Sequence, residues 1–132
     1  MSDPAMAVQA AIVSALRSSS ALTAEISGVF DGPPPRAPFP YVAISDGLVT
    51  DWSTKTEPGR DIRVALTVWD DYESPARLHR LMHACAQAMA TLPPTLEGWR
   101  IVNCTFLRSL VTRSATGPWA GLVEHRVRVM GA

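Results

Sequence analysis

The chain has 132 residues, enough for one domain whose hydrophobic core needs no metal or disulfide. Its hydrophobic fraction of 47% is ordinary for a globular protein, and its formal net charge is zero. A net charge of zero argues against tight binding to DNA. The length of the chain predicts a single domain over residues 1–132.

The charges are unevenly divided along the chain. Residues 1–73 hold ten acids and five bases, whereas residues 74–132 hold two acids and seven bases. If the two halves form different faces, copies of the chain can pack head to tail. The alternative is that folding mixes the charges within one subunit.

The N-terminal region predicts one helix and then an extended connector. The helix begins at Ser2 or Asp3, with Pro4 in its first turn. Its inner stripe is formed by Val8, Ile12 and Leu16. A short helical turn around Leu22 and Ile26 follows. The five prolines between residues 31 and 40 then favour a polyproline-like path, either as a rigid connector or as a docking surface.

Two strands are predicted next, joined by a long polar loop. Residues 41–45 read as a strand, and residues 61–69 alternate apolar and polar side chains as a half-buried strand does. Residues 46–60 between them contain Trp52 and Lys55, and loops of this length are often functional.

A central amphipathic helix is predicted over residues 74–92. Ser74 is a typical N-cap residue, and Pro75 suits the first helical position. Apolar side chains recur at steps of three and four, at Leu78, Leu81, Met82, Cys85, Met89 and Leu92. Pro93 and Pro94 end the helix.

Two long strands complete the chain. Residues 100–113 are expected to place Val102, Cys104 and Phe106 on one face, and a turn at 114–118 follows. Residues 120–130 place three valines and His125 inward and Glu124, Arg126 and Arg128 outward. The whole pattern predicts an α+β fold, a four-stranded mostly antiparallel sheet with two main helices packed on one face.

No catalytic or cofactor-binding motif is found, so we expect no catalytic residue, cofactor or metal. His79 and His83 have the i, i+4 spacing of a zinc helix, but Arg80 stands where the general-base glutamate would be. Cys85 and Cys104 read as free thiols in apolar surroundings, typical of a reducing compartment. Because the chain opens without a basic, apolar signal and has no run of ~20 apolar residues, we expect synthesis in the cytoplasm and no membrane partner.

Arginines on the last two strands and tryptophans at element ends favour protein contacts. Arginine and tryptophan are enriched at interfaces, although the tryptophans could equally cover the ends of the core. The candidate interface residues on this ground are Trp52, Trp69, Arg126 and Arg128.

Several segments together resemble a known family. They are residues 3–11, 29–34, 39–44 and 50–55, with Gly59-Arg60 and Val68-Trp69. The most specific are Phe39-Pro40-Tyr41-Val42 and Asp51-Trp52-Ser53-Thr54-Lys55. In this order, over nearly the full chain, they resemble the tail-completion or tail-terminator proteins of long-tailed phages, prophages and gene transfer agents.

This resemblance implies a structural, non-enzymatic role. Such proteins form a ring, typically a hexamer, on the last ring of the tail tube, stop its growth and present the surface that joins the head. The partners would be further copies of the chain, the major tail tube protein and a head–tail connector protein. DNA would pass through the ring without sequence-specific binding. The protein would be assembled in the bacterial cytoplasm and remain at the head-proximal end of the tail.

The resemblance also implies that the loop over residues 50–60 contacts a neighbouring subunit or the tube, with Trp52, Lys55 and Arg60 as the candidate interface residues in it. Two other functions stay open at this point. One is a head–tail connector adaptor of the same architecture, and the other is a small enzyme of unknown chemistry.

Overall fold

The computed structural model describes residues 3–32, 34, 36–45, 47–113 and 115–132. Three helices and seven strands occur in this part of the chain. In order they are α1 (Pro4–Arg17), α2 (Ser20–Thr23), β1 (Val29–Asp31), β2 (Tyr41–Ser45), β3 (Val49–Asp51), β4 (Gly59–Asp70), α3 (Ala76–Met89), β5 (Thr95–Leu96), β6 (Trp99–Arg113) and β7 (Trp119–Gly131). The expected four-stranded sheet with two main helices is therefore wrong.

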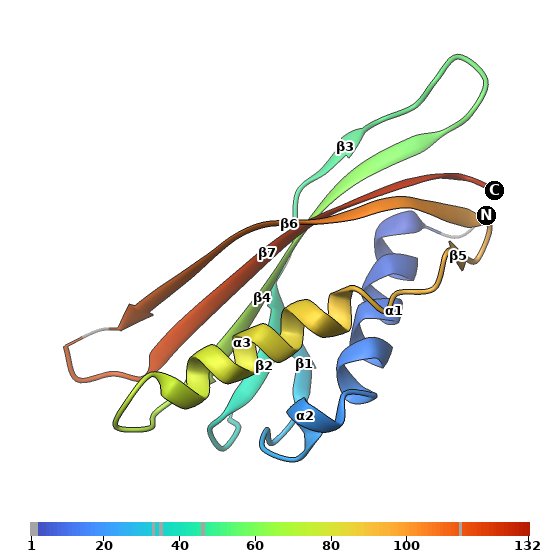
Figure 1. Ribbon diagram of the computed structural model, residues 1–132. Coiled ribbons are helices and arrows are strands. Elements are labelled where there is room, and N and C mark those ends of the chain that lie inside the picture. Colours follow the sequence, from blue (N-terminus) through green and yellow to red (C-terminus); the bar gives the residue numbers. More distant parts are fainter. Residues whose placement is uncertain (1–2, 33, 35, 46, 114) are drawn as a thin grey trace.

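The strands form one curled, mixed sheet in the order β1-β2-β4-β7-β6-β5, with β3 paired to β4 beside β2. The β1–β2 pair is parallel, and the other pairs are antiparallel. The helices lie on one side of the sheet, and two hairpins, β3–β4 and β6–β7, extend from its opposite ends (Figure 1).

The missing strands are short, which explains the error. The four predicted strands correspond to β2, β4, β6 and β7, whereas β1, β3 and β5 contain only two or three residues each. A segment of that length cannot show a period of two, so tertiary pairing rather than local pattern makes it a strand. β3 lies inside the stretch expected to be a loop.

The core lies between α3 and the two central strands. Leu78, Leu81, Cys85 and Met89 are buried, as predicted, against the inward valines of β4 and β7. A side chain at Gly121 of β7 would meet the Met82 sulfur at 2.5 Å, so glycine allows this close approach. The helix begins later than predicted, because Pro75 occupies the N-cap position without a side-chain cap.

The N-terminal prediction is confirmed in its main feature. Asp3 caps α1, and Val8, Ile12 and Leu16 are buried. The alternative cap Ser2 lies outside the described residues, as do Pro33 and Pro35 of the connector and Ser114 of the last turn. No helix in the described ranges combines the length and the hydrophobicity required to cross a bilayer.

The pairing of β6 with β7 contains two bulges. Its register shifts between Ile101 and Asn103 and again between Phe106 and Arg108. Cys104 and Phe106 still pair with inward residues of β7, but Val102 is the extra residue of the first bulge and is exposed. The expected placement of Val102 beside them is wrong for that reason.

Opposite charges of the two sequence halves meet within the subunit. Of the eight ion pairs among the described residues, six join a residue before position 74 to one after it. Arg80 of α3 pairs with Glu25, for example, and Arg100 of β6 lies 3.6 Å from Glu57. The sequence asymmetry is therefore largely neutralised by folding, which was the alternative to a head-to-tail charge split.

A buried ion pair connects the end of β4 to α3. Asp70 is fully buried, and its two carboxylate oxygens accept bonds from Arg77 Nε at 2.9 Å and Nη2 at 2.6 Å. Burial raises the pKa of Asp70, but Arg77 and the N–H groups of Tyr72 and Asp71 outweigh that effect, so the pKa lies below its usual value. Arg77 also lies 4.8 Å from the Tyr72 ring centroid.

The Leu81→Ala variant tests the packing of α3 on the sheet. Leu81 is fully buried, so we expect the free energy of unfolding to fall by about 2–5 kcal/mol in chemical denaturation. Gln87→Ala, at an exposed position of the same helix, should change it by less than ~0.5 kcal/mol. Equal stability of the two variants would show that α3 does not cover the core.

The Asp70→Asn variant tests the buried ion pair. Because the folded pKa of Asp70 lies below its unfolded value of 3.8, its contribution to stability is present above pH 3.8 and is lost as pH falls through the folded pKa. We expect the variant to lose about 3 kcal/mol at pH 7, with the deficit shrinking below pH 3.8. A deficit that is constant with pH, or no larger than that of the exposed control Glu73→Gln, would contradict this account.

Candidate functional site

The sheet face turned away from the helices carries most of the charged side chains of the central strands. Alternation along β4 and β7 buries one set of residues and turns the other set outward. The register places Asp61 opposite Arg128, Arg63 opposite Arg126, and Arg108 of β6 opposite Glu124. Three strands thus bring these side chains onto one surface.

Two carboxylates lie among four arginines on this surface. Glu124 lies 3.6 Å from both Arg63 and Arg108. Asp61 accepts a hydrogen bond from Arg128 Nε at 2.9 Å and lies 3.9 Å from Arg126 Nε. The four arginines exceed the two acids by two charges, so the surface stays positive.

The β3–β4 hairpin adds a tryptophan to the same surface. The Arg128 guanidinium lies 5.0 Å from the centroid of the Trp52 ring, and Arg60 Nη1 lies 3.2 Å from Asp51. A side chain at Gly59 would come within 2.3 Å of the Trp52 carbonyl oxygen, so glycine lets the hairpin close and fixes Trp52 over Arg128.

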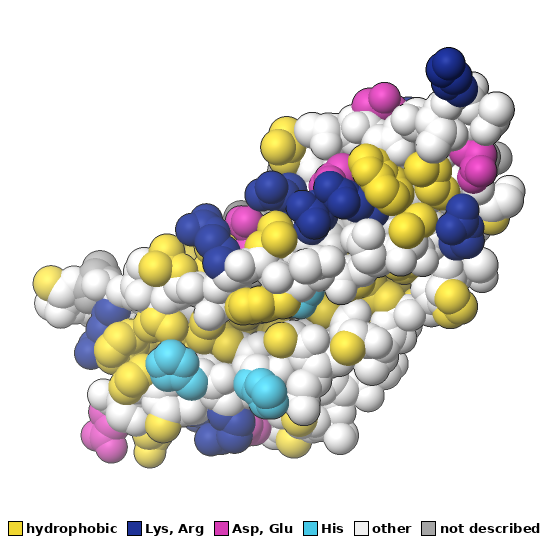
Figure 2. Space-filling view, turned by 45° about the horizontal axis from the view of Figure 1, so that its top comes forward, with side chains coloured by type: hydrophobic (Ala, Val, Ile, Leu, Met, Phe, Trp, Pro, Cys, Tyr) yellow, Lys and Arg dark blue, Asp and Glu magenta, His cyan; other side chains and the backbone are white. Residues whose placement is uncertain are grey.

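We name this surface the outer-face cluster. It contains Trp52, Asp61, Arg63, Arg108, Glu124, Arg126 and Arg128. Figure 2 shows Lys and Arg side chains in a band with acidic side chains among them.

The structure brings three of the six predicted interface residues together, because Trp52, Arg126 and Arg128 belong to the outer-face cluster. Arg60 lies opposite Val129, on the other face of β4, and pairs with Asp51. Lys55 is exposed in the turn of the β3–β4 hairpin. Trp69 lies near the far end of β4, opposite Tyr41 and Ala120, and is outside the cluster.

Sequence reasoning missed Asp61, Arg63 and Glu124 as members of the site. Their alternation with buried valines and isoleucine marks them as outward, but only the strand register shows which charge meets which. The pairing of Arg128 with Asp61, 67 residues apart, has no local signal in the sequence.

Two arginines of the cluster have bonding capacity that a partner can reach. The Arg63 and Arg108 side chains are 45% and 58% exposed and lie 3.6 Å from Glu124. Arg126 Nε also forms no hydrogen bond within the described chain, but it is buried. A guanidinium group binds carboxylates and carbonyl oxygens through several parallel N–H donors. The outer-face cluster can therefore recognise acidic or carbonyl-rich protein surfaces.

The histidines and cysteines lie apart from this cluster. His79 and His83 are exposed on α3, and His125 is buried, which lowers its pKa. Burial raises the pKa of the Cys85 thiol to about 12, so the reactive thiolate is disfavoured. No group of three His, Cys, Asp or Glu side chains suited to a metal ion occurs among the residues with described positions.

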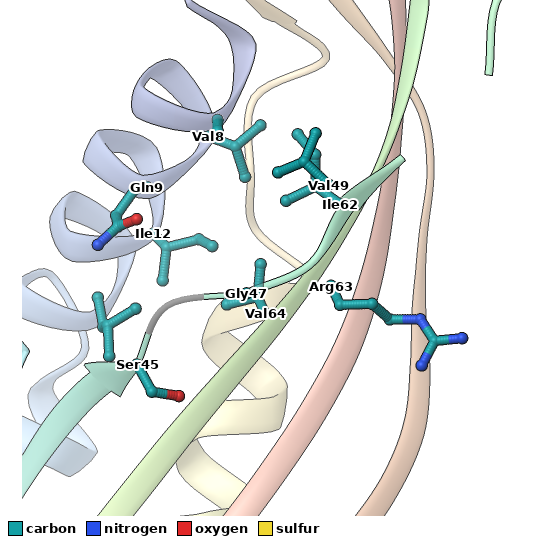
Figure 3. A pocket seen from close by; sticks show the side chains of 11 residues that line it. Val8, Gln9, Ile12, Ser45, Gly47, Val49, Ile62, Arg63 and Val64 are labelled. Carbon is teal, nitrogen blue, oxygen red and sulfur yellow. The ribbon is translucent and has the colours of Figure 1, made fainter. Parts of the chain in front are cut away.

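A cavity of about 230 Å³ lies between α1 and the start of the β3–β4 hairpin. Figure 3 shows Val8, Ile12, Val49 and Ile62 around it, with the Arg63 side chain directed away. Its remaining polar side chains have partners elsewhere, since Ser45 donates to the Ala65 carbonyl oxygen and Gln9 to Asp31. The cavity thus offers an apolar lining without a free polar group to orient a small polar ligand.

Comparisons with known proteins agree on one family. The family model described as "Tail completion protein gp17" matches residues 10–130. A chain from a structure described as the virion of a native gene transfer agent particle is 30% identical, with a TM-score of 0.83, covering 96% of this chain and 97% of that one. The gp17 protein of bacteriophage SPP1 has the same fold, with 24% identity and a TM-score of 0.64 over 92% of this chain and 88% of that one.

A search of curated proteins found no match to the sequence. The family model nevertheless covers most of the chain, in agreement with the resemblance carried by its sequence segments. The chain belongs to the tail completion protein gp17 family.

Proposed function

We propose that this protein caps the tail tube of a phage or gene transfer agent as a ring, stops tube growth and provides the surface that joins the head. The observation that carries the proposal is the full-length similarity to a chain of a gene transfer agent virion. A ring of copies, typically a hexamer, would contact the major tail tube protein on one side and the head–tail connector on the other. DNA would pass through the ring without being read.

The outer-face cluster supports a role in protein contacts. Arg128 is hydrogen-bonded to Asp61, which reduces the side-chain freedom that this arginine would lose on binding. Trp52 adds a flat aromatic surface next to them. Arginine and tryptophan are the residue types that contribute most at interfaces. We assign Trp52, Lys55, Arg60, Arg126 and Arg128 to contacts with a neighbouring subunit or the tube, with Trp69 as a separate contact.

Deletion of this protein from a producing strain tests the function. We expect particles with overlong tails of variable length and no attached heads in electron micrographs, because nothing ends tube growth. Expression of the wild-type chain in trans should restore tail length. Tails of normal length that carry no head connector would contradict termination and would favour a connector adaptor instead.

Substitution of the outer-face cluster tests its assignment. The double variant Trp52→Ala/Arg128→Ala should reduce the fraction of capped tubes at least tenfold, because an aromatic and an arginine contact are lost together. The matched control is Arg80→Ala, which removes an arginine paired with Glu25 on the helix side. Thermal melting would verify that both variants fold. Equal capping by the two folded variants would overturn the assignment.

A further inference from the structure

The outer-face cluster is continued by apolar side chains on the same face of the sheet. The register places Leu110 of β6 and Thr67 of β4 on either side of Leu122 of β7. Leu122 lies two residues before Glu124, so both side chains point to the same face, about 7 Å apart along the strand. Leu110 is 48% exposed, and the helices lie on the other side of the sheet (Figure 1). Apolar surface is therefore exposed beside the arginines.

Aromatic side chains continue this surface to the far end of β4. Tyr41 of β2 and Ala120 of β7 lie on either side of Trp69, which is on the same face of β4 as Arg63. The Tyr41 ring stacks on the Phe39 ring, with centroids 5.6 Å apart. We name the set the apolar strip, and it contains Tyr41, Trp69, Leu110 and Leu122. One face of the sheet thus has an apolar half and a positively charged half.

The charged half offers a place for a carboxylate side chain. A hollow of about 190 Å³ lies beside Arg63 and Glu124 and is also lined by Leu48 and Ala65. Leu48 is exposed, and so is much of the Arg63 side chain. A guanidinium group forms strong, charge-assisted hydrogen bonds with carboxylates. The hollow therefore suits a partner side chain with an aliphatic stem and a terminal carboxylate.

A protein matches this face better than a nucleic acid does. Asp61 and Glu124 lie among the arginines and would repel the phosphates of a nucleic acid. The apolar strip offers a phosphate backbone no charged contact. A protein surface with carboxylates opposite the exposed arginines and apolar side chains opposite the strip is complementary to both halves.

A second copy of this chain has few free carboxylates to offer. The acids that pair with arginines within the subunit are Glu25, Asp51, Glu57, Asp61, Asp70 and Glu124. Asp3 caps α1, and Asp31 accepts a hydrogen bond from Gln9. Of the two partners proposed for the outer-face cluster, a neighbouring subunit and the tube, the tube is therefore the better match.

We propose that this face of the sheet, from the outer-face cluster to the apolar strip, docks on an acidic and partly apolar surface of the tail tube. The inference rests on the proposed function and names the chemistry of the partner. Arg63 and Arg108 bind carboxylates of the tube, and the contact at Trp69 is the apolar end of the same footprint. Each subunit of a ring presents one such face to the tube.

Charge variants of the two exposed arginines test the proposal. Tail tubes from the same particle are mixed with each purified variant, and capped tubes are counted by electron microscopy. We expect the protein concentration that caps half of the tubes to rise about tenfold for Arg63→Ala/Arg108→Ala and about a hundredfold for Arg63→Glu/Arg108→Glu, because the new carboxylates repel those of the tube. Arg80→Ala, which also removes an exposed arginine paired with a glutamate, should cap as the wild type does.

A variant of the apolar strip tests the other half of the footprint. Leu110→Glu should raise the same concentration about tenfold, because a carboxylate then faces an apolar part of the tube. Gln87→Glu places the same charge on an exposed position of α3 and should have no effect. Thermal melting would verify that all variants fold. Capping by Leu110→Glu at the wild-type concentration would overturn the continuous footprint.

Two further measurements on the arginine variants separate the possible occupants. Sedimentation without tubes should give every variant the wild-type mass, and fluorescence anisotropy with a short DNA duplex should give them the wild-type signal. A loss of self-association would make a second copy the occupant, and a loss of DNA binding with normal capping would make it DNA. Either result, or unchanged capping by the glutamate variant, would overturn the tube contact. A wild-type protein that caps no tubes would contradict the proposed function itself.

Discussion

The antiparallel pairing of β4 with β7 is the constraint on which the rest of the structure depends. Twelve residue pairs join the strands without a break, from Gly59 opposite Met130 to Asp70 opposite Trp119. Because side chains alternate, one register places valines against α3 and arginines on the outer face at the same time. A slip of one residue would bury the arginines and expose the valines. Core and candidate interface are therefore specified by the same set of hydrogen bonds.

Each end of this pair of strands is secured by an arginine from the C-terminal half of the sequence. At one end Arg77 binds the buried carboxylate of Asp70, which ties the start of α3 to β4. At the other end Arg128 binds Asp61 and lies over Trp52, which ties the β3–β4 hairpin to β7. The charge asymmetry of the sequence is thus used within the subunit.

Long periodic segments could be predicted from the sequence, and short or irregular ones could not. The stripe from Leu78 to Met89 and the alternation in β4 and β7 each extend over enough residues to show their period. β1, β3 and β5 become strands only because a longer neighbour pairs with them. The sequence around Val102 alternates apolar and polar residues, but the bulge inserts one unpaired residue there, so Val102 does not lie on the face that the alternation predicts. In the candidate interface, the outward arginines could be predicted from the alternation. Their pairing with Asp61 and Glu124 could not, because most of the paired residues are far apart in the sequence.

The central claim is that this protein works through contacts with other protein subunits at the end of a tail tube. A cryo-electron microscopy reconstruction of the head-proximal tail end, from particles containing this chain, tests it most directly. The account predicts a closed ring of copies there, with Trp52, Arg126 and Arg128 covered by a neighbouring subunit or the tube. Density for the chain elsewhere in the particle, or a ring that leaves these side chains in solvent, would contradict it.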